Sequence, residues 1–249
     1  MTGRFSYADA ASEAYCQQRS LPEPEYLKRL AQLTKEREGF WAVMLVNPLQ
    51  GAALQQFVQM TGAKNILEIG CFTGYSAGWM AEGLIESGAD KQGGLVYTVE
   101  LDSERAKFAE DYANESGRGH LIKVLNKSGN DALASFPDGT KFDLVFIDAD
   151  KSGYEGYIRT LLDRNLLSPN GAIITDNVTF GGYVQKVDNE TGKLPEEFAK
   201  EIKNQVAAQY IKEVEAVAKF NNYIHNEPRL NAVLLPLFDG LHIITQKRV

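Results

Sequence analysis

The first part of the chain has the pattern of helices rather than strands. Three stretches between residues 5 and 62 indicate helices, over residues 7–19, 24–37 and 48–60. Pro48 begins the third stretch, and the first turn of a helix tolerates proline. We therefore expect an N-terminal helical extension over residues 1–46.

From residue 64 the pattern changes to short apolar runs that alternate with helical stretches. The runs are bounded by Gly, Asp or Asn and cover residues 64–70, 94–100, 120–126, 142–148 and 171–177. This alternation predicts a parallel sheet wrapped by helices. The runs are apolar at successive positions, as expected of strands that are buried on both faces. Two further runs, 230–236 and 241–247, predict a closing antiparallel pair.

A long charged stretch over residues 195–220 separates these last two groups of strands. Its apolar residues recur every three or four positions and form one stripe: Phe198, Ile202, Val206, Tyr210, Val214 and Val217. A surface helix that packs on the core and a lid over a binding site both fit this pattern, and the sequence leaves the two open.

Composition narrows the class of protein. The chain has 249 residues, 44% of them hydrophobic, which suits one domain over residues 1–249. The net charge of −7 argues against a nucleic-acid partner. No apolar stretch approaches the roughly 20 residues of a membrane span, and the N-terminus lacks a secretory pattern, so we expect a cytoplasmic protein. With two cysteines and three histidines, a bound metal would need oxygen ligands.

Acidic and amide side chains gather at the predicted strand ends. They are Glu68, Glu100, Asp102, Asp148, Asp150, Asp176 and Asn177. In open sheets of this kind, ligands bind at the carboxyl ends of the strands. Any one of these residues alone could be a turn or a helix cap. Several carboxylates at one edge cost electrostatic energy unless a cation or a hydroxyl-rich ligand binds there.

The stretch "NILEIGCFTGYS" follows the first run and defines the cofactor class. Gly70 and Gly74 allow a tight turn with a G-x-x-x-G spacing, which differs from the dinucleotide pattern G-x-G-x-x-G. Glu68 beside the loop would repel a pyrophosphate, so the ligand should be cationic. Glu100 ends the second run, where an acid can accept both hydroxyls of a ribose. A ribose together with a cation indicates S-adenosylmethionine.

Four motifs in order resemble the cation-dependent O-methyltransferases typified by caffeoyl-CoA and catechol O-methyltransferases. They are "LEIGCFTGYS", "FDLVFIDADKSGY", "GAIITDNV" and "LLPLFDGLHI", and the resemblance extends from about residue 47 to the C-terminus. It implies a Rossmann-like, doubly wound α/β fold with a seven-stranded sheet, the last strand antiparallel, and helices on both faces. The family expectation for assembly is a homodimer.

The resemblance also implies roles for individual residues. The residues that match metal ligands are Asp148, Asp176 and Asn177. Their oxygen donors suit Mg²⁺ or another hard cation such as Mn²⁺ or Ca²⁺. The residues that match cofactor contacts are Glu68, Gly70, Gly74, Tyr75, Ser76, Glu100, Asp131 and Asp148. Lys151 matches the general base, and Asp148 completes the catalytic pair.

The function expected from these residues is transfer of a methyl group to one hydroxyl of a vicinal-dihydroxy, catechol-type small phenolic. A free catechol, a flavonoid and a CoA ester all remain open as acceptor. Residues of about 183–218 read as an insertion near the site. A nicotinamide oxidoreductase would need the G-x-G-x-x-G loop and a Y-x-x-x-K pair, which the sequence lacks. The intact set of Asp148, Lys151, Asp176 and Asn177 argues against a non-catalytic binding module.

Overall fold

The computed structural model describes residues 10–205 and 208–247 of the chain. Its seven strands are β1 (Asn65–Ile69), β2 (Leu95–Glu100), β3 (Ile122–Asn126), β4 (Phe142–Ile147), β5 (Leu167–Thr175), β6 (Leu230–Leu235) and β7 (Leu241–Gln246). Its α-helices are α1 (Ala10–Gln18), α2 (Glu25–Glu38), α3 (Pro48–Thr61), α4 (Tyr75–Glu86), α5 (Ser103–Glu115), α6 (Gly129–Ser135), α7 (Tyr154–Asp163), α8 (Glu196–Gln205) and α9 (Ala208–Asn226).

All seven strands form one sheet in the order β3-β2-β1-β4-β5-β7-β6. The first five strands pair in parallel, and β7 runs antiparallel to both of its neighbours. This confirms the predicted doubly wound sheet with an antiparallel last strand. β5 begins earlier than predicted because Leu167 already pairs with Phe142, before a register irregularity in the ladder.

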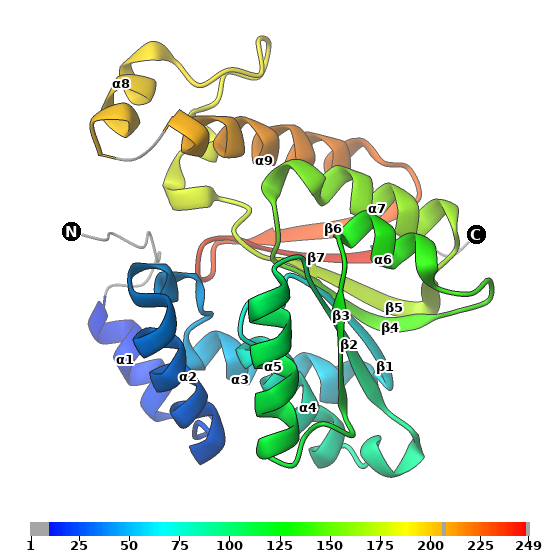
Figure 1. Ribbon diagram of the computed structural model, residues 1–249. Helices are drawn as coiled ribbons and strands as arrows, with labels where there is room; N and C mark the ends of the chain where they lie inside the picture. The colour runs from blue at the N-terminus through cyan, green and yellow to red at the C-terminus, as the bar shows by residue number, and fades with distance from the viewer. Residues whose placement is uncertain (1–9, 206–207, 248–249) are drawn as a thin grey trace.

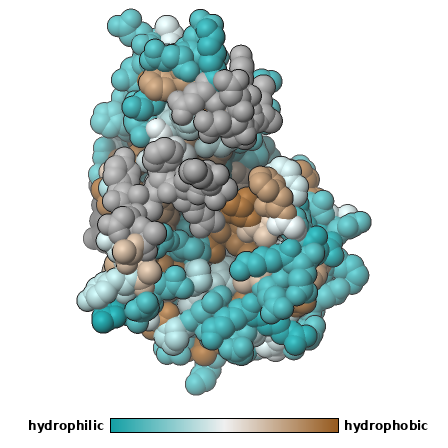
Figure 2. Space-filling view, turned by 90° about the vertical axis from the view of Figure 1, so that its left-hand side faces the viewer, coloured by the Kyte–Doolittle hydropathy of each residue, from teal (hydrophilic) through white to brown (hydrophobic). Residues whose placement is uncertain are grey.

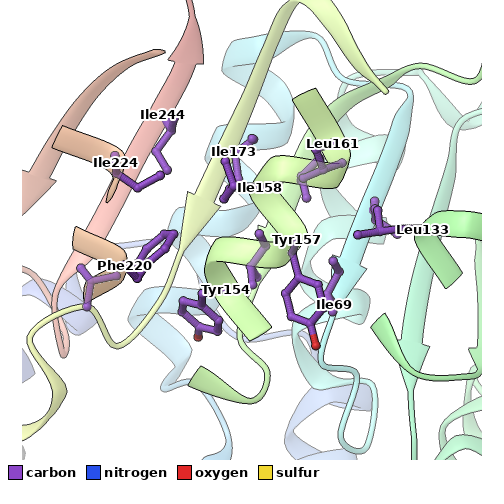
Figure 3. Close-up of a cluster of buried hydrophobic side chains, with 14 of the residues drawn as sticks. Ile69, Leu133, Tyr154, Tyr157, Ile158, Leu161, Ile173, Phe220, Ile224 and Ile244 are labelled. Carbon is purple, nitrogen blue, oxygen red and sulfur yellow. The ribbon is translucent and has the colours of Figure 1, made fainter. Parts of the chain in front are cut away.

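Helices cover both faces of the sheet, and each face has its own core (Figure 1). Leu67, Val145 and Ile173 point toward α6, α7 and α9, where they join a large apolar cluster. Figure 3 shows part of this cluster, with Tyr154 of α7 beside Phe220 of α9. The intervening residues Ile66 and Leu144 point toward α3 and α4. The alternation explains why the predicted strands were apolar at successive positions.

The N-terminal helices pack on α4, which follows the first strand. Leu27 and Leu30 of α2 form a small core with Trp79 of α4. α3 lies so close to α4 that a Cβ atom at Gly51 would be 2.2 Å from the indole nitrogen of Trp79. Glycine at this position therefore allows α3 to pack closely against α4. Between α2 and α3, a 3-10 helix over Gly39–Met44 exposes Phe40 and Trp41, and the sequence did not predict it.

The described residues of the charged stretch after β5 are helical, in α8 and α9, as the sequence predicted. Ile202, Val214 and Val217 of the predicted stripe are buried, and Phe198 and Tyr210 are partly buried against the same core. Val206 lies outside the described residues. The stripe therefore packs on the core as a surface helix would, with α8 beside the start of α9 (Figure 1). Among the described residues, no helix has the length and apolar character needed to cross a membrane.

Candidate active site

The glycine pair after β1 shapes the turn at the strand end. Gly70 has a φ of 108°, and a Cβ atom there would lie 2.0 Å from the carbonyl oxygen of Asp148. Gly74 has a φ of 90° and precedes the first residue of α4. Both φ values lie in the region that only glycine adopts readily. Gly70 therefore allows β1 to lie directly against the end of β4, which carries Asp148.

Glu68 lies beneath this turn rather than on its open side. Its side chain is fully buried and accepts a hydrogen bond from the Thr98 hydroxyl. Burial raises the pKa of Glu68 to about 8, although hydrogen bonds from Ser76 and Thr98 oppose the rise. Glu68 thus bonds to Thr98 of the neighbouring strand. Its direct contact with a bound ligand stays a prediction.

Glu100 connects the glycine turn to the end of β2. One carboxylate oxygen accepts from the backbone nitrogen of Phe72 at 2.7 Å, and the other accepts from that of Asp102 at 2.9 Å. Burial raises the pKa of Glu100, and these backbone donors oppose the rise. Because it is only partly buried, Glu100 retains the access that the predicted ribose contact requires.

Two of the predicted cofactor residues, Tyr75 and Asp131, have hydrogen-bond partners within the protein. The Tyr75 hydroxyl donates to Glu23 at 2.5 Å, in the connection before α2, and its buried ring meets Trp79 edge-on. Asp131 is exposed and forms reciprocal hydrogen bonds with Ser128, which caps α6. The structure therefore gives both residues local structural partners, and their contact with the cofactor stays a prediction.

Lys151 brings two of the predicted metal ligands together. Its ammonium nitrogen donates to Asp148 Oδ1 at 3.0 Å and to Asn177 Oδ1 at 2.9 Å. It also donates to the Tyr154 hydroxyl at 2.7 Å, and that hydroxyl donates to the carbonyl of Asp176 at 3.1 Å. The ammonium group of Lys151 thus contacts an oxygen of Asp148 and an oxygen of Asn177 at the same time.

The protonation of Lys151 bears on its predicted role as general base. Burial alone lowers the pKa of this lysine, but the oxygens of Tyr154 and Asp148 outweigh burial and raise the pKa above its ordinary value. Lys151 is therefore an ammonium group at neutral pH in this arrangement. Its role as base stays a prediction, and it requires the contacts with Asp148 and Asn177 to be given up.

Asp176 is buried, and both of its carboxylate oxygens have donors. One oxygen accepts from the backbone nitrogen of Asn177 at 2.8 Å, and the other accepts from Gln50 Nε2 of α3 at 2.7 Å. Burial and the nearby charge of Asp148 raise the pKa of Asp176, and a cation at this edge would counter both effects. Gln50 was not predicted from the sequence.

The loop after β5 is fixed by the turn between β6 and β7. The backbone nitrogens of Val178 and Thr179 donate to the carbonyls of Gly240 and Asp239. The Asp239 carboxylate accepts from the backbone nitrogen of Gly181 at 2.8 Å. Asp239 thus supports the loop after β5. The sequence analysis did not identify this role, although the motif "LLPLFDGLHI" contains Asp239. Asn177 has a φ of 57°, so this support holds a strained residue in place.

Phe180 in this loop is partly covered by the predicted insertion. Its ring stacks on Tyr210 of α9 at 4.7 Å between ring centres, and it lies 5.9 Å from the Lys151 nitrogen. One face of Phe180 is therefore already occupied. Figure 2 views the side of the molecule on which β5 ends, and apolar side chains gather there among mostly hydrophilic ones.

The donor set at this edge fits a hard cation. Across residues 10–205 and 208–247, no three His, Cys, Asp or Glu side chains are grouped to hold a metal ion. The ligand set that the family resemblance implies, Asp148, Asp176 and Asn177, consists of two carboxylates and one amide oxygen. Oxygen donors suit Mg²⁺, which commonly keeps several water ligands. The bridging ammonium of Lys151 supports a cation position between Asp148 and Asn177.

Comparison with known proteins identifies the family. Residues 17–247 match the O-methyltransferase family. The chain is 29% identical to O-methyltransferase hkm8 of Aspergillus hancockii, over 94% of this chain and 92% of that protein. It is 36% identical to a catechol O-methyltransferase of Niastella koreensis, over 56% and 60% of the two chains. A caffeoyl-CoA O-methyltransferase of Petroselinum crispum is 27% identical, over 88% and 83%.

Solved structures agree with these relatives. The SAH-bound methyltransferase PaMTH1 of Podospora anserina superimposes with a TM-score of 0.81 and 29% identity, over 95% of this chain and 94% of that one. An O-methyltransferase from Bacillus cereus in complex with SAH has a TM-score of 0.75 and 28% identity, over 95% and 97%. SAH is the product that S-adenosylmethionine leaves after it gives up its methyl group.

The fold and the site therefore define a class I methyltransferase that uses S-adenosylmethionine. More specifically, the chain belongs to the O-methyltransferase family that includes the caffeoyl-CoA and catechol enzymes. This confirms the predicted family and the predicted class of enzyme, an O-methyltransferase that uses S-adenosylmethionine, and it argues against the nicotinamide oxidoreductase.

Proposed function

We propose that this enzyme depends on a divalent cation and methylates one hydroxyl of a catechol-type small phenolic. The observation that carries the proposal is the bridge from Lys151 to Asp148 and Asn177, with the buried carboxylate of Asp176 next in the chain. Three oxygen ligands on the ends of two neighbouring strands suit a cation, and the relatives named for catechol and caffeoyl-CoA support the acceptor class.

The cofactor, the cation and the protein side chains would each have a separate part in the methyl transfer. S-adenosylmethionine supplies a methyl group that is already activated by its sulfonium charge. A bound Mg²⁺ ion favours the ionised form of a phenol, whose pKa is otherwise about 10. Asp148, Asp176 and Asn177 would hold this ion, and Tyr154 accepts a hydrogen bond from Lys151 beside them. Lys151 has the predicted role of base, which requires it to give up its proton and its contacts with Asp148 and Asn177.

The proposal is tested with labelled S-adenosylmethionine and a panel of phenolics, with and without Mg²⁺. We expect turnover to stop in excess chelator and to return when Mg²⁺ or Mn²⁺ is added. Asp176→Ala should abolish turnover as well, while the affinity for S-adenosylmethionine persists. Full activity in excess chelator would refute the metal assignment. Cofactor binding without turnover on any catechol would favour the non-catalytic binding module.

We also propose that the enzyme is a homodimer, as the family resemblance implies. Strand β6 lies at the edge of the sheet, and its Val233 and Leu234 are 48% and 39% exposed. An exposed apolar edge strand is usually covered in the native assembly. Sedimentation equilibrium at micromolar concentration should give twice the chain mass. A monomer under these conditions would contradict this part of the proposal and leave the activity untouched.

A further inference from the structure

Gln50 of helix α3 contacts the side chain of Asp176 from outside the strand ends that carry the site. Its amide nitrogen donates to Asp176 Oδ2 at 2.7 Å across 126 residues of sequence. The exposed fractions of Gln50 and Asp176 are 5% and 3%, so water competes little for this bond. Because a carboxylate can only accept, the amide must present its NH₂ group to Asp176.

The position of Gln50 is fixed from three sides. Asn47 caps α3 and accepts from the backbone nitrogen of Gln50 at 2.8 Å. Asn47 itself donates to Glu13 of α1 at 2.6 Å. Gly51, the residue after Gln50, lies directly against the Trp79 side chain of α4. The first turn of α3 therefore has little freedom, and the Gln50 amide reaches Asp176 from a set direction.

We propose that Gln50 is a positioning residue, which orients the Asp176 carboxylate for the cation. With one oxygen tied to Gln50 and the other to the backbone of Asn177, the carboxylate cannot rotate without breaking a buried hydrogen bond. Partners of this kind orient metal ligands, and their loss typically costs about 10- to 100-fold in metal affinity. The inference rests on the proposed cation dependence.

The test measures Mn²⁺ affinity of the full-length protein by the electron paramagnetic resonance signal of free Mn²⁺. Gln50→Met keeps an unbranched side chain of similar length and removes the donor. Gln55→Met is the matched control, because Gln55 is also buried on α3, whereas the hydrogen bond to Asp176 comes from Gln50. We expect Gln50→Met to weaken Mn²⁺ binding about 10- to 100-fold and Gln55→Met to leave it unchanged. The affinity for S-adenosylmethionine should match wild type in both variants.

Equal Mn²⁺ affinity in Gln50→Met and wild type overturns the inference, as does an equal loss in both variants. If Gln50→Met does not fold, Gln50→Asn withdraws the donor by one methylene and should weaken Mn²⁺ binding in the same direction. Wild-type Mn²⁺ binding at the site, abolished by Asp176→Ala, tests the proposed function separately. A wild-type protein that does not bind Mn²⁺ at the site therefore counts against cation dependence. Wild-type binding that Gln50→Met does not weaken selectively counts against the role of Gln50 alone.

Discussion

The Tyr154 hydroxyl lies 2.7 Å from the ammonium nitrogen of Lys151, and both groups are buried at the end of the sheet. The same hydroxyl donates to the backbone carbonyl of Asp176 at 3.1 Å. One phenolic oxygen thus connects the lysine that follows β4 to the acidic residue that follows β5. The ring of Tyr154 is held by an edge contact with Phe220 of α9 (Figure 3).

Tyr154→Phe should lower both stability and turnover while leaving the ring packing in place. The change removes a buried acceptor from Lys151 and a donor from the Asp176 carbonyl, which costs about 1 to 3 kcal/mol for groups of this kind. Urea unfolding measures the stability, and initial rates measure the turnover. Tyr157→Phe is the control, because its hydroxyl bonds to Asp150 rather than to Lys151. An equal loss of turnover in both variants would contradict a special role for Tyr154.

Much of this fold could be predicted because its strands are apolar on both faces. Runs such as residues 64–70 and 142–148 have few alternatives to a strand covered by helices on both sides. The start of β5 was missed because Ser168-Pro169-Asn170 has the composition of a turn. The Gly39–Met44 segment was missed because its exposed apolar residues give no alternation of polar and apolar positions.

The acidic residues at the strand ends could be predicted to lie together because parallel strands end at the same side of a sheet. Asp148 and Asp176 follow neighbouring strands, so their proximity follows from topology alone. Gln50 could not be found in this way. Its contact with Asp176 depends on how α3 packs against α4, and nothing in the residues around Gln50 marks it as different from a glutamine on a surface helix.

His242 should make stability fall as the pH drops below about 6.5. Its side chain is 5% exposed, neither ring nitrogen has a hydrogen-bond partner in the described chain, and burial lowers its pKa to about 4. A lowered pKa means that the unfolded state takes up the proton first. The contribution of the neutral ring is therefore complete above pH 6.5 and is lost as the pH falls toward 4.

Between pH 7 and pH 5 this loss amounts to roughly 2 kcal/mol. Glu68 acts in the opposite direction, because its raised pKa makes the folded state bind its proton first. The difference between wild type and His242→Leu isolates the histidine. Between pH 7 and pH 5, urea unfolding should show that the stability of wild type changes less favourably than that of the variant, by roughly 2 kcal/mol. Parallel pH profiles for the two proteins would contradict the prediction.

Tyr210→Ala should change acceptor preference more than cofactor affinity. Tyr210 comes from α9 and covers one face of Phe180, whose ring lies near Lys151, whereas the predicted cofactor residues follow β1 to β4. Contacts in an acceptor pocket typically change discrimination by about 10- to 200-fold. The ratio of kcat/KM for two phenolics of different size measures the effect. Tyr223→Ala is the control, since Tyr223 lies near the end of α9 and donates a hydrogen bond to Glu227, just after the helix. A loss of S-adenosylmethionine binding with an unchanged acceptor ratio would show that this segment supports the cofactor instead.

Acceptors with two adjacent hydroxyls should react faster than the matching monophenols. Asp148, Asp176 and Asn177 supply three oxygens, which leaves about three positions on an octahedral cation. A vicinal diol can fill two of them, so that its second hydroxyl fixes the direction of the first. A monophenol offers a single donor and can rotate, and such a misplacement costs on the order of 10²-fold in rate. Initial rates for a catechol and its monohydroxy analogue, at matched Mg²⁺ and S-adenosylmethionine, measure the difference. Equal rates would mean that the acceptor hydroxyl is oriented by Lys151 or by the side chains around Phe180. They would contradict orientation by a cation bound to Asp148, Asp176 and Asn177.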